Sequence, residues 1–232
     1  MGDFIHSLYV VKNICERRNA KANVYLNKGG DVWTYGIEKA YNDLYPIISK
    51  QSYINKFEVA GDVNYVDIDL NDWRKEVAQT HIETGKYDKC WTELLSSYYG
   101  FDIPKEYKWL EVNEVDQSTV DRVVFHRSTH HHSSIDFWKK QIDTLNEVPV
   151  FVTTSQQEFE QFPLNYYVTP YILQTVSEWV VAIASCKFFV GNQSAGFAIA
   201  SALDIPRTCE LYDDVAVFYS GETKYSKNIK FN

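Results

Sequence analysis

The stretch VGNQSAGFAIASALDIPRTCEL (190–211) decides the fold class of this chain. It reads as the end of an apolar strand, KFFV (187–190), followed by a polar turn. The alanine-rich segment GFAIASAL (196–203) predicts a short, tightly packed helix, and a second strand follows Pro206. A strand, a helix and another strand in this order are typical of a parallel sheet.

The polar turn itself has the composition of an anion-binding loop. Gly191 permits unusual backbone dihedrals, while Ala195 and Gly196 allow a ligand to approach the backbone closely. Free amides in the first turn of the helix, together with the positive end of its dipole, suit a diphosphate. Asn192, Gln193 and Ser194 are therefore candidate ligand-binding residues. A plain connection between strand and helix is the alternative interpretation.

The rest of the second half repeats the alternation of strand and helix. The predicted strands are 121–126, 148–154 and 187–190, and the predicted helices are 134–146, one starting at Thr169 and Pro170, and 196–203. Such an order predicts a parallel sheet that is covered on both faces.

The first half mixes helices and strands less regularly. Its predicted elements are a helix from Asp3 to Arg18, a strand over 22–27, helical and irregular structure over 37–50, a strand over 63–70 and a helix over 87–100. The polar segment 113–118 shows no periodic pattern and is a candidate linker. We therefore expect one domain over 1–115 and another over 116–232.

Composition excludes several classes of protein. The 232 residues carry a net charge of −8, which disfavours a general nucleic-acid binder. No apolar run is long enough for a transmembrane segment and no secretion signal is evident, so a cytoplasmic location is expected. The four cysteines form no CxxC pair, which indicates reduced thiols rather than a zinc site or a disulfide scaffold.

A second polar loop, HRSTHHHSS (126–134), follows the predicted strand 121–126. Because ligands bind at the carboxyl ends of parallel strands, this loop and the Gly191 turn are expected to share one site. Arg127 could clamp a phosphate in bidentate fashion, while Ser128, Thr129 and Ser133 could donate hydroxyl groups. A solvated loop is the alternative. Consecutive histidines seldom converge on one ion, so a metal site is not expected there.

The amino-terminal stretch MGDFIHS (1–7) suggests a different role. A carboxylate at Asp3, opposite an anion-binding loop, could take a proton from an acceptor hydroxyl, and His6 could share or orient it. Alternatively, Asp3 is only a helix N-cap.

The sequence DID (67–69) gives a competing hypothesis. Asp67 and Asp69 on one face of a strand could hold Mn²⁺ or Mg²⁺ against a sugar-nucleotide diphosphate. The favoured interpretation is an ordinary alternating strand, with Val66, Ile68 and Leu70 packed inward.

Three segments together resemble glycosyltransferase family 9, the heptosyltransferase-like enzymes. GDFIHSLYVVKNICERR (2–18) is similar to the family's opening glycine-aspartate helix, and VVFHRSTHHHSSIDFWKKQIDTLNEVPVFVTT (123–154) to its donor loop, tryptophan-bearing helix and following strand. SEWVVAIASCKFFVGNQSAGFAIASALDIPRTCELY (177–212) resembles its closing pattern, with a G-N-D-[ST]-G turn.

The resemblance implies a GT-B fold, in which two Rossmann-like halves face each other across a cleft. It implies metal-independent sugar transfer, without a cofactor, from a GDP-, ADP- or UDP-sugar to a hydroxyl of a glycan or lipid-linked acceptor. Asp3 would be the general base, and the nucleotide would lie against His126–Thr129 and Gly191–Gly196, with Glu210 near its ribose or phosphate. A surface salt bridge is the alternative role for Glu210.

Departures from the family leave the transferred sugar open. Gln193 replaces the family's aspartate, Ala198 replaces its histidine, and no donor-loop lysine is evident unless His131, His132 or Lys139 substitutes for it. HRST (126–129) also resembles the strand end of some fucosyltransferases. A metal-dependent GT-A transferase using Asp67 and Asp69, and an inactive nucleotide- or glycan-binding module, remain alternatives.

Overall fold

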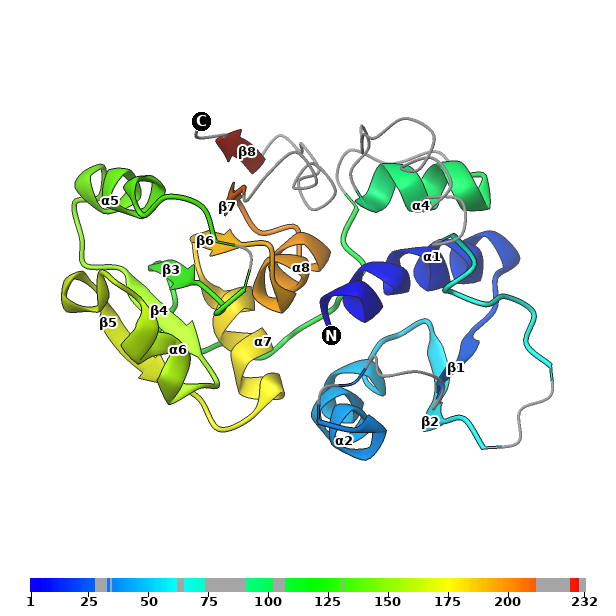
Figure 1. Cartoon of the computed structure of the whole chain (residues 1–232). Helices are drawn as coiled ribbons and strands as arrows, with labels where there is room; N and C mark the ends of the chain where they lie inside the picture. The colour runs from blue at the N-terminus through cyan, green and yellow to red at the C-terminus, as the bar shows by residue number, and fades with distance from the viewer. Residues whose placement is uncertain are drawn as a thin grey trace.

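The structure is a computed structural model that describes residues 1–27, 33, 35–61, 65–73, 91–101, 107–130, 132–211 and 226–229. It is an α/β protein with two parallel sheets, one in each half of the chain (Figure 1). The predicted α/β class with parallel sheets is confirmed.

The second half is built on a six-stranded sheet with the order β5-β4-β3-β6-β7-β8, all of its pairs parallel. Its strands are β3 (Val123–His126), β4 (Val150–Thr153), β5 (Thr169–Ile172), β6 (Phe188–Asn192), β7 (Arg207–Glu210) and β8 (Ser226–Ile229). Its helices are α5 (Asp136–Asp143), α6 (Gln156–Gln161), the 3₁₀ turn η1 (Asn165–Tyr167), α7 (Val176–Ser185) and α8 (Ala195–Ala202).

Both faces of this sheet are buried, because successive strand residues belong to different hydrophobic clusters. Val124 and Phe189 pack in the cluster that includes α7 and α8. Phe125 and Val190 pack with Trp138 of α5 in the other cluster. The apolar runs that predicted these strands are thus explained by burial on two sides.

The described part of the first half contains a smaller sheet of two parallel strands. Its elements are α1 (Gly2–Arg18), β1 (Ala22–Leu26), α2 (Ile37–Ile48), β2 (Ile54–Val59) and α4 (Trp91–Tyr99). Helix α1 ends at Asn19, whose left-handed backbone (φ 47°) closes the last turn. The helical structure predicted within 37–50 is α2, and the strand predicted over 22–27 is β1; both are confirmed.

Helix α1 joins the two halves, because it packs along α8 (Figure 1). Leu8 and Val11 of α1 share one hydrophobic cluster with Phe197 and Ile199 of α8. The amino terminus of the chain therefore lies beside the larger sheet's helices rather than on a separate surface.

Two sequence predictions are wrong. Residues 65–70 of the strand predicted over 63–70 are irregular, with Val66 exposed, whereas the strand of this region is β2. Thr169 and Pro170 lie in the edge strand β5, not at a helix start. Helix α7 begins later, where Thr175 and Glu178 form a capping box.

Other predictions lie partly outside the described residues. Cys15, Cys186 and Cys209 are free and buried, as expected for reduced core thiols, while Cys90 lies outside the described residues. Of the helix predicted over 87–100, α4 is described; its Leu95 is buried, but Tyr98 is exposed.

Candidate functional site

The candidate site lies where β3 and β6 end side by side. The chain runs from β3 outward to β4 and β5, and then returns to place β6 on the other side of β3. His126 at the end of β3 is the register partner of Gly191. In parallel α/β folds, ligands bind at the carboxyl edge of the sheet beside such a switch point, and this edge between β3 and β6 is called the crevice below. The loops predicted to share one site therefore meet.

The turn between β6 and α8 leaves α8 without a side-chain N-cap. Ser194 is the N-cap in an extended conformation, but its side chain caps no amide of the helix and instead donates to the backbone oxygen of Asn192 at 3.3 Å. The backbone N–H of Ala198 is the donor to the Ser194 carbonyl oxygen. The first amides of a helix have no partner within the helix, which is what an anion site requires.

Two glycines of this turn are required by close packing. A Cβ added to Gly196 would lie 2.9 Å from His126 Cδ2 and 2.9 Å from Trp179 Cζ2. A Cβ added to Gly191 would lie 2.5 Å from Phe189 Cε1. Neither glycine has a positive φ, so the unusual backbone dihedral considered for Gly191 is not present. The glycines therefore serve packing of the turn against buried rings.

His126 supports the site from inside. Its Nδ1 lies 3.0 Å from the Val152 carbonyl oxygen, and its ring packs 4.7 Å from the Trp179 ring centroid. Burial lowers the pKa of His126, although the Glu158 carboxylate opposes that shift. Direct contact between His126 and a nucleotide stays a prediction.

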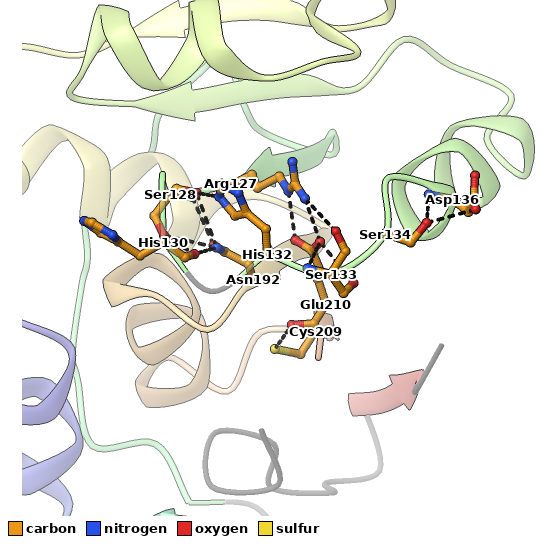
Figure 2. Close-up of polar contacts among 10 residues, drawn as sticks. All are labelled: Arg127, Ser128, His130, His132, Ser133, Ser134, Asp136, Asn192, Cys209 and Glu210. Carbon is orange, nitrogen blue, oxygen red and sulfur yellow. Dashed lines mark hydrogen bonds and ion pairs between the residues drawn. The ribbon is translucent and has the colours of Figure 1, made fainter. Parts of the chain in front are cut away.

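Asn192 ties the two loops together. Its Oδ1 accepts a hydrogen bond from the Ser128 amide at 3.0 Å. Its Nδ2 donates to Ser128 Oγ at 3.1 Å and to the His130 carbonyl oxygen at 2.6 Å (Figure 2). The side chain is fully buried, so it shapes the loop after β3 rather than presenting an amide to solvent.

Arg127 is engaged by Glu210, which corrects the expectation of a guanidinium open to phosphate. Arg127 Nε donates to Glu210 Oε2 and Nη2 donates to Oε1, both at 2.9 Å (Figure 2). The two side chains are 7% and 0% exposed, so this is a buried ion pair and not the surface salt bridge considered for Glu210. The bidentate fork predicted for a phosphate binds a carboxylate of this chain instead.

Three other predicted residues stay at the crevice. Thr129 is half-buried in the loop after β3, and Ala195 is half-buried at the start of α8. Gln193 is 5% exposed, and its Nε2 has no hydrogen-bond partner among the described residues. A buried donor without a partner is costly, and a bound polar ligand could satisfy it.

The amino-terminal helix reaches this site. A Cβ added to Gly2 would lie 3.6 Å from Ala195 Cα and 3.8 Å from Ala198 Cβ. Asp3 is half-buried in the first turn of α1, but it is not the N-cap, which is Met1. The carboxylate and the α8 turn are therefore brought to the same region.

His6 lies inside the protein. It is 2% exposed, and its ring lies 6.4 Å from the Trp109 ring centroid. Burial lowers the pKa of His6 to about 4; the nearby Asp3 carboxylate raises the pKa and Arg207 lowers it. Because it is buried, His6 is not exposed to an acceptor. That His6 shares or orients the proton taken by Asp3 stays a prediction.

The DID segment (67–69), the competing candidate for a metal site, is not the strand that the sequence predicted. Asp67 and Asp69 lie in an exposed irregular segment, and Asp69 Oδ1 accepts hydrogen bonds from Asn71. Across the described residues, no group of three or more acidic, histidine or cysteine side chains is arranged to hold a metal ion.

A shallow pocket of about 500 Å³ lies near the opposite end of α1, lined by residues that include Lys12, Cys15 and Glu111. Lys12 Nζ donates to Glu111 Oε1 at 3.2 Å and to the Lys108 carbonyl oxygen at 2.8 Å. Its charged groups neutralise each other, so this pocket lacks the chemistry of the β3–β6 crevice.

Comparison with solved structures shows that the chain has the fold of family 9 glycosyltransferases. It is similar to heptosyltransferase WaaC of E. coli with ADP (TM-score 0.58, 13% identity, covering 98% of this chain and 89% of that chain). It is also similar to a family 9 glycosyltransferase from Veillonella parvula DSM 2008 (0.53, 9%, 98% and 82%).

A third similar structure is the iron-containing dodecameric glycosyltransferase TibC of enterotoxigenic E. coli H10407 (TM-score 0.54, 12% identity), of which 60% is covered by all of this chain. No family model and no curated protein matches the sequence. No helix in the described part of the chain has the length and apolar character needed to cross a membrane.

Proposed function

We propose that this chain is a metal-independent glycosyltransferase that moves a sugar from a nucleotide-sugar to a hydroxyl group. One observation carries the proposal: the start of α8 at Ser194 and Ala195, which has no side-chain cap, adjoins the first turn of α1, which bears Asp3. An anion-binding helix end and a carboxylate thus border one crevice edge. The shared fold with ADP-bound WaaC supports this proposal.

In the proposed reaction, the acceptor oxygen attacks the anomeric carbon while the bond from that carbon to the phosphate oxygen breaks. Asp3 takes the acceptor proton, and the nucleoside diphosphate leaves with the bonding electrons. Amides at Ser194–Gly196 and the hydroxyl group of Thr129 stabilise the charge on the leaving group. We propose Gln193 Nε2 as a further donor to the bound nucleotide-sugar, since it lacks a partner among the described residues.

The proposed division of labour follows the two halves of the chain, 1–115 and 116–232. The second half binds the nucleotide, and the first half binds a glycan or lipid-linked acceptor near Asp3. Metal independence is supported by the chemistry of the site, because backbone amides and a helix dipole can meet diphosphate charge without a cation. A cytoplasmic location remains a prediction.

The experiment begins with calorimetry of the purified chain against ADP, GDP and UDP, followed by transfer and hydrolysis assays with the matching nucleotide-sugars. We expect one nucleoside diphosphate to bind and its sugar conjugate to turn over equally in EDTA and in buffer. Loss of turnover in EDTA that Mn²⁺ restores would instead support metal-dependent transfer.

An inactive binding module is the second candidate. It is favoured by one observation, that two nitrogens of the Arg127 guanidinium already donate to Glu210 within the chain. Nucleotide binding without turnover, across a broad acceptor panel, would support the module over the enzyme.

A further inference from the structure

The loop after β3 is held at both of its ends by one carboxylate. Arg127, its first residue, donates to both oxygens of Glu210 at 2.9 Å. Ser133, its last residue, donates to Glu210 Oε1 through its amide at 2.9 Å and through its hydroxyl at 3.1 Å. The loop is defined here as 127–133; His131 lies outside the described residues.

The two ends are also joined directly, because Arg127 Nη2 donates to the Ser133 carbonyl oxygen at 3.3 Å. Arg127, Ser133 and Glu210 therefore form a closed hydrogen-bonded ring (Figure 2). Arg127 and Glu210 are 83 positions apart in the sequence. Arg127 directly follows β3 and Glu210 ends β7, and in the sheet only β6 lies between these two strands.

A second attachment lies beside the first. Asn192 and Glu210 are register partners on β6 and β7, and Asn192 holds Ser128 and His130 in the middle of the loop. The side chains of Asn192 and Glu210 are both fully buried. Breaking their hydrogen bonds to the loop would leave a buried polar group without a partner, which is costly.

We propose that Glu210 is a positioning residue that fixes the 127–133 loop for the nucleotide-sugar. This inference rests on the proposed function. Glu210 does not touch the ligand; it neutralises Arg127 and anchors Ser133, so that Thr129 keeps one arrangement at the crevice. A fixed loop reduces the ordering cost of binding.

A purely structural ion pair predicts different behaviour from a positioning residue. Replacing both members of a buried ion pair with apolar residues of similar size often restores stability lost in the single variants. An apolar side chain at position 210, however, cannot accept the hydrogen bonds that Ser133 donates. Stability and loop order can therefore be separated in one double variant.

The experiment compares the full chain with Arg127→Met, Glu210→Leu and the Arg127→Met/Glu210→Leu double variant. The melting temperature, hydrogen exchange of amides in the 127–133 loop, and the Kd of the nucleoside diphosphate are measured for each. We expect both single variants to melt below the wild type and the double variant to regain most of that loss. Loop exchange in the double variant should stay at least tenfold faster than in the wild type, and its Kd at least tenfold weaker.

Recovery of loop protection and of Kd together with the melting temperature would overturn the proposal. If the single variants fail to fold, Ser133→Ala and Glu210→Gln provide milder changes to the same ring, and unchanged loop exchange in both would also overturn it. A wild-type chain that binds no nucleotide would refute the proposed function alone, because loop exchange would still decide whether Glu210 holds the loop.

Discussion

Gly2 and Ala195 lie in contact at the junction of α1 and α8, where a Cβ on Gly2 would stand 3.6 Å from the Ala195 Cα atom. The first turns of α1 and α8 are thus adjacent in space, although 193 positions separate Gly2 from Ala195 in the sequence. This junction places the Asp3 carboxylate near the turn proposed to hold the diphosphate.

Asp3→Asn should abolish most of the sugar transfer while leaving nucleotide affinity unchanged. The amide has the shape of the carboxylate but cannot accept a proton, and a positioned general base contributes roughly 10²–10⁴-fold to a rate. Transfer rates and calorimetry of both chains check this. Glu38→Gln removes an exposed carboxylate from the first turn of α2 and is the matched control. A rate retained by Asp3→Asn would remove Asp3 from the mechanism.

Ser194→Asp should change stability and nucleotide affinity in opposite directions. The Ser194 side chain does not cap α8, and an aspartate at an N-cap stabilises a helix by about 0.5–2 kcal/mol. The same negative charge would repel a diphosphate at the helix start. Ser194→Asn supplies a cap without a charge and is the control. Equal nucleotide affinity in the two variants would exclude the α8 start from the diphosphate site.

Gly196→Ala should destabilise the protein by about 1–3 kcal/mol, the range for overpacking a buried site. Its Cβ would lie 2.9 Å from both the His126 and Trp179 rings. Gly2→Ala is the comparison, because its Cβ would meet Ala195 Cα at an ordinary 3.6 Å. Urea unfolding measures both changes, and equal stabilities of the two variants would contradict the packing described for the turn.

Acid should weaken the fold through the buried His6. Its folded pKa is lowered from 6.5 to about 4, so the unfolded chain binds the proton more readily. His6 does not weaken the fold above pH 6.5, where it is neutral in both states. As the pH falls from 6.5 toward 4, the free energy of unfolding decreases with a slope approaching about 1.4 kcal/mol per pH unit. Unfolding free energies at pH 7, 6 and 5 should fall less steeply for His6→Gln than for the wild type; an identical slope would contradict this origin.

The sequence predicted the larger sheet best where burial is two-sided. VVFH (123–126) and VFVT (150–153) are buried throughout, and their apolar runs leave little alternative to a central strand. Edge strand β5 was mistaken for a helix start because Thr169 and Pro170 also suit a first helical turn. The T-x-x-E signal at Thr175 and Glu178 could have placed α7 correctly.

The candidate site was predicted as a set of loops, and its internal pairing was not. The strand ends at His126 and Gly191 meet as the alternation of elements implied. The Arg127–Glu210 pair could not be foreseen, since it depends on β7 joining the sheet beside β6, which no local pattern records. A guanidinium in a polar loop looks the same in sequence whether a ligand or a distant carboxylate binds it.

The account depends most directly on where a nucleoside diphosphate binds. A crystal structure of the chain soaked with ADP, GDP or UDP is the decisive measurement. The account predicts density for a diphosphate within hydrogen-bond distance of the Ala195 or Gly196 amide, with the sugar side of the nucleotide directed toward Asp3. A diphosphate bound on another surface, or a crevice between β3 and β6 that stays empty at saturating nucleotide, would contradict it.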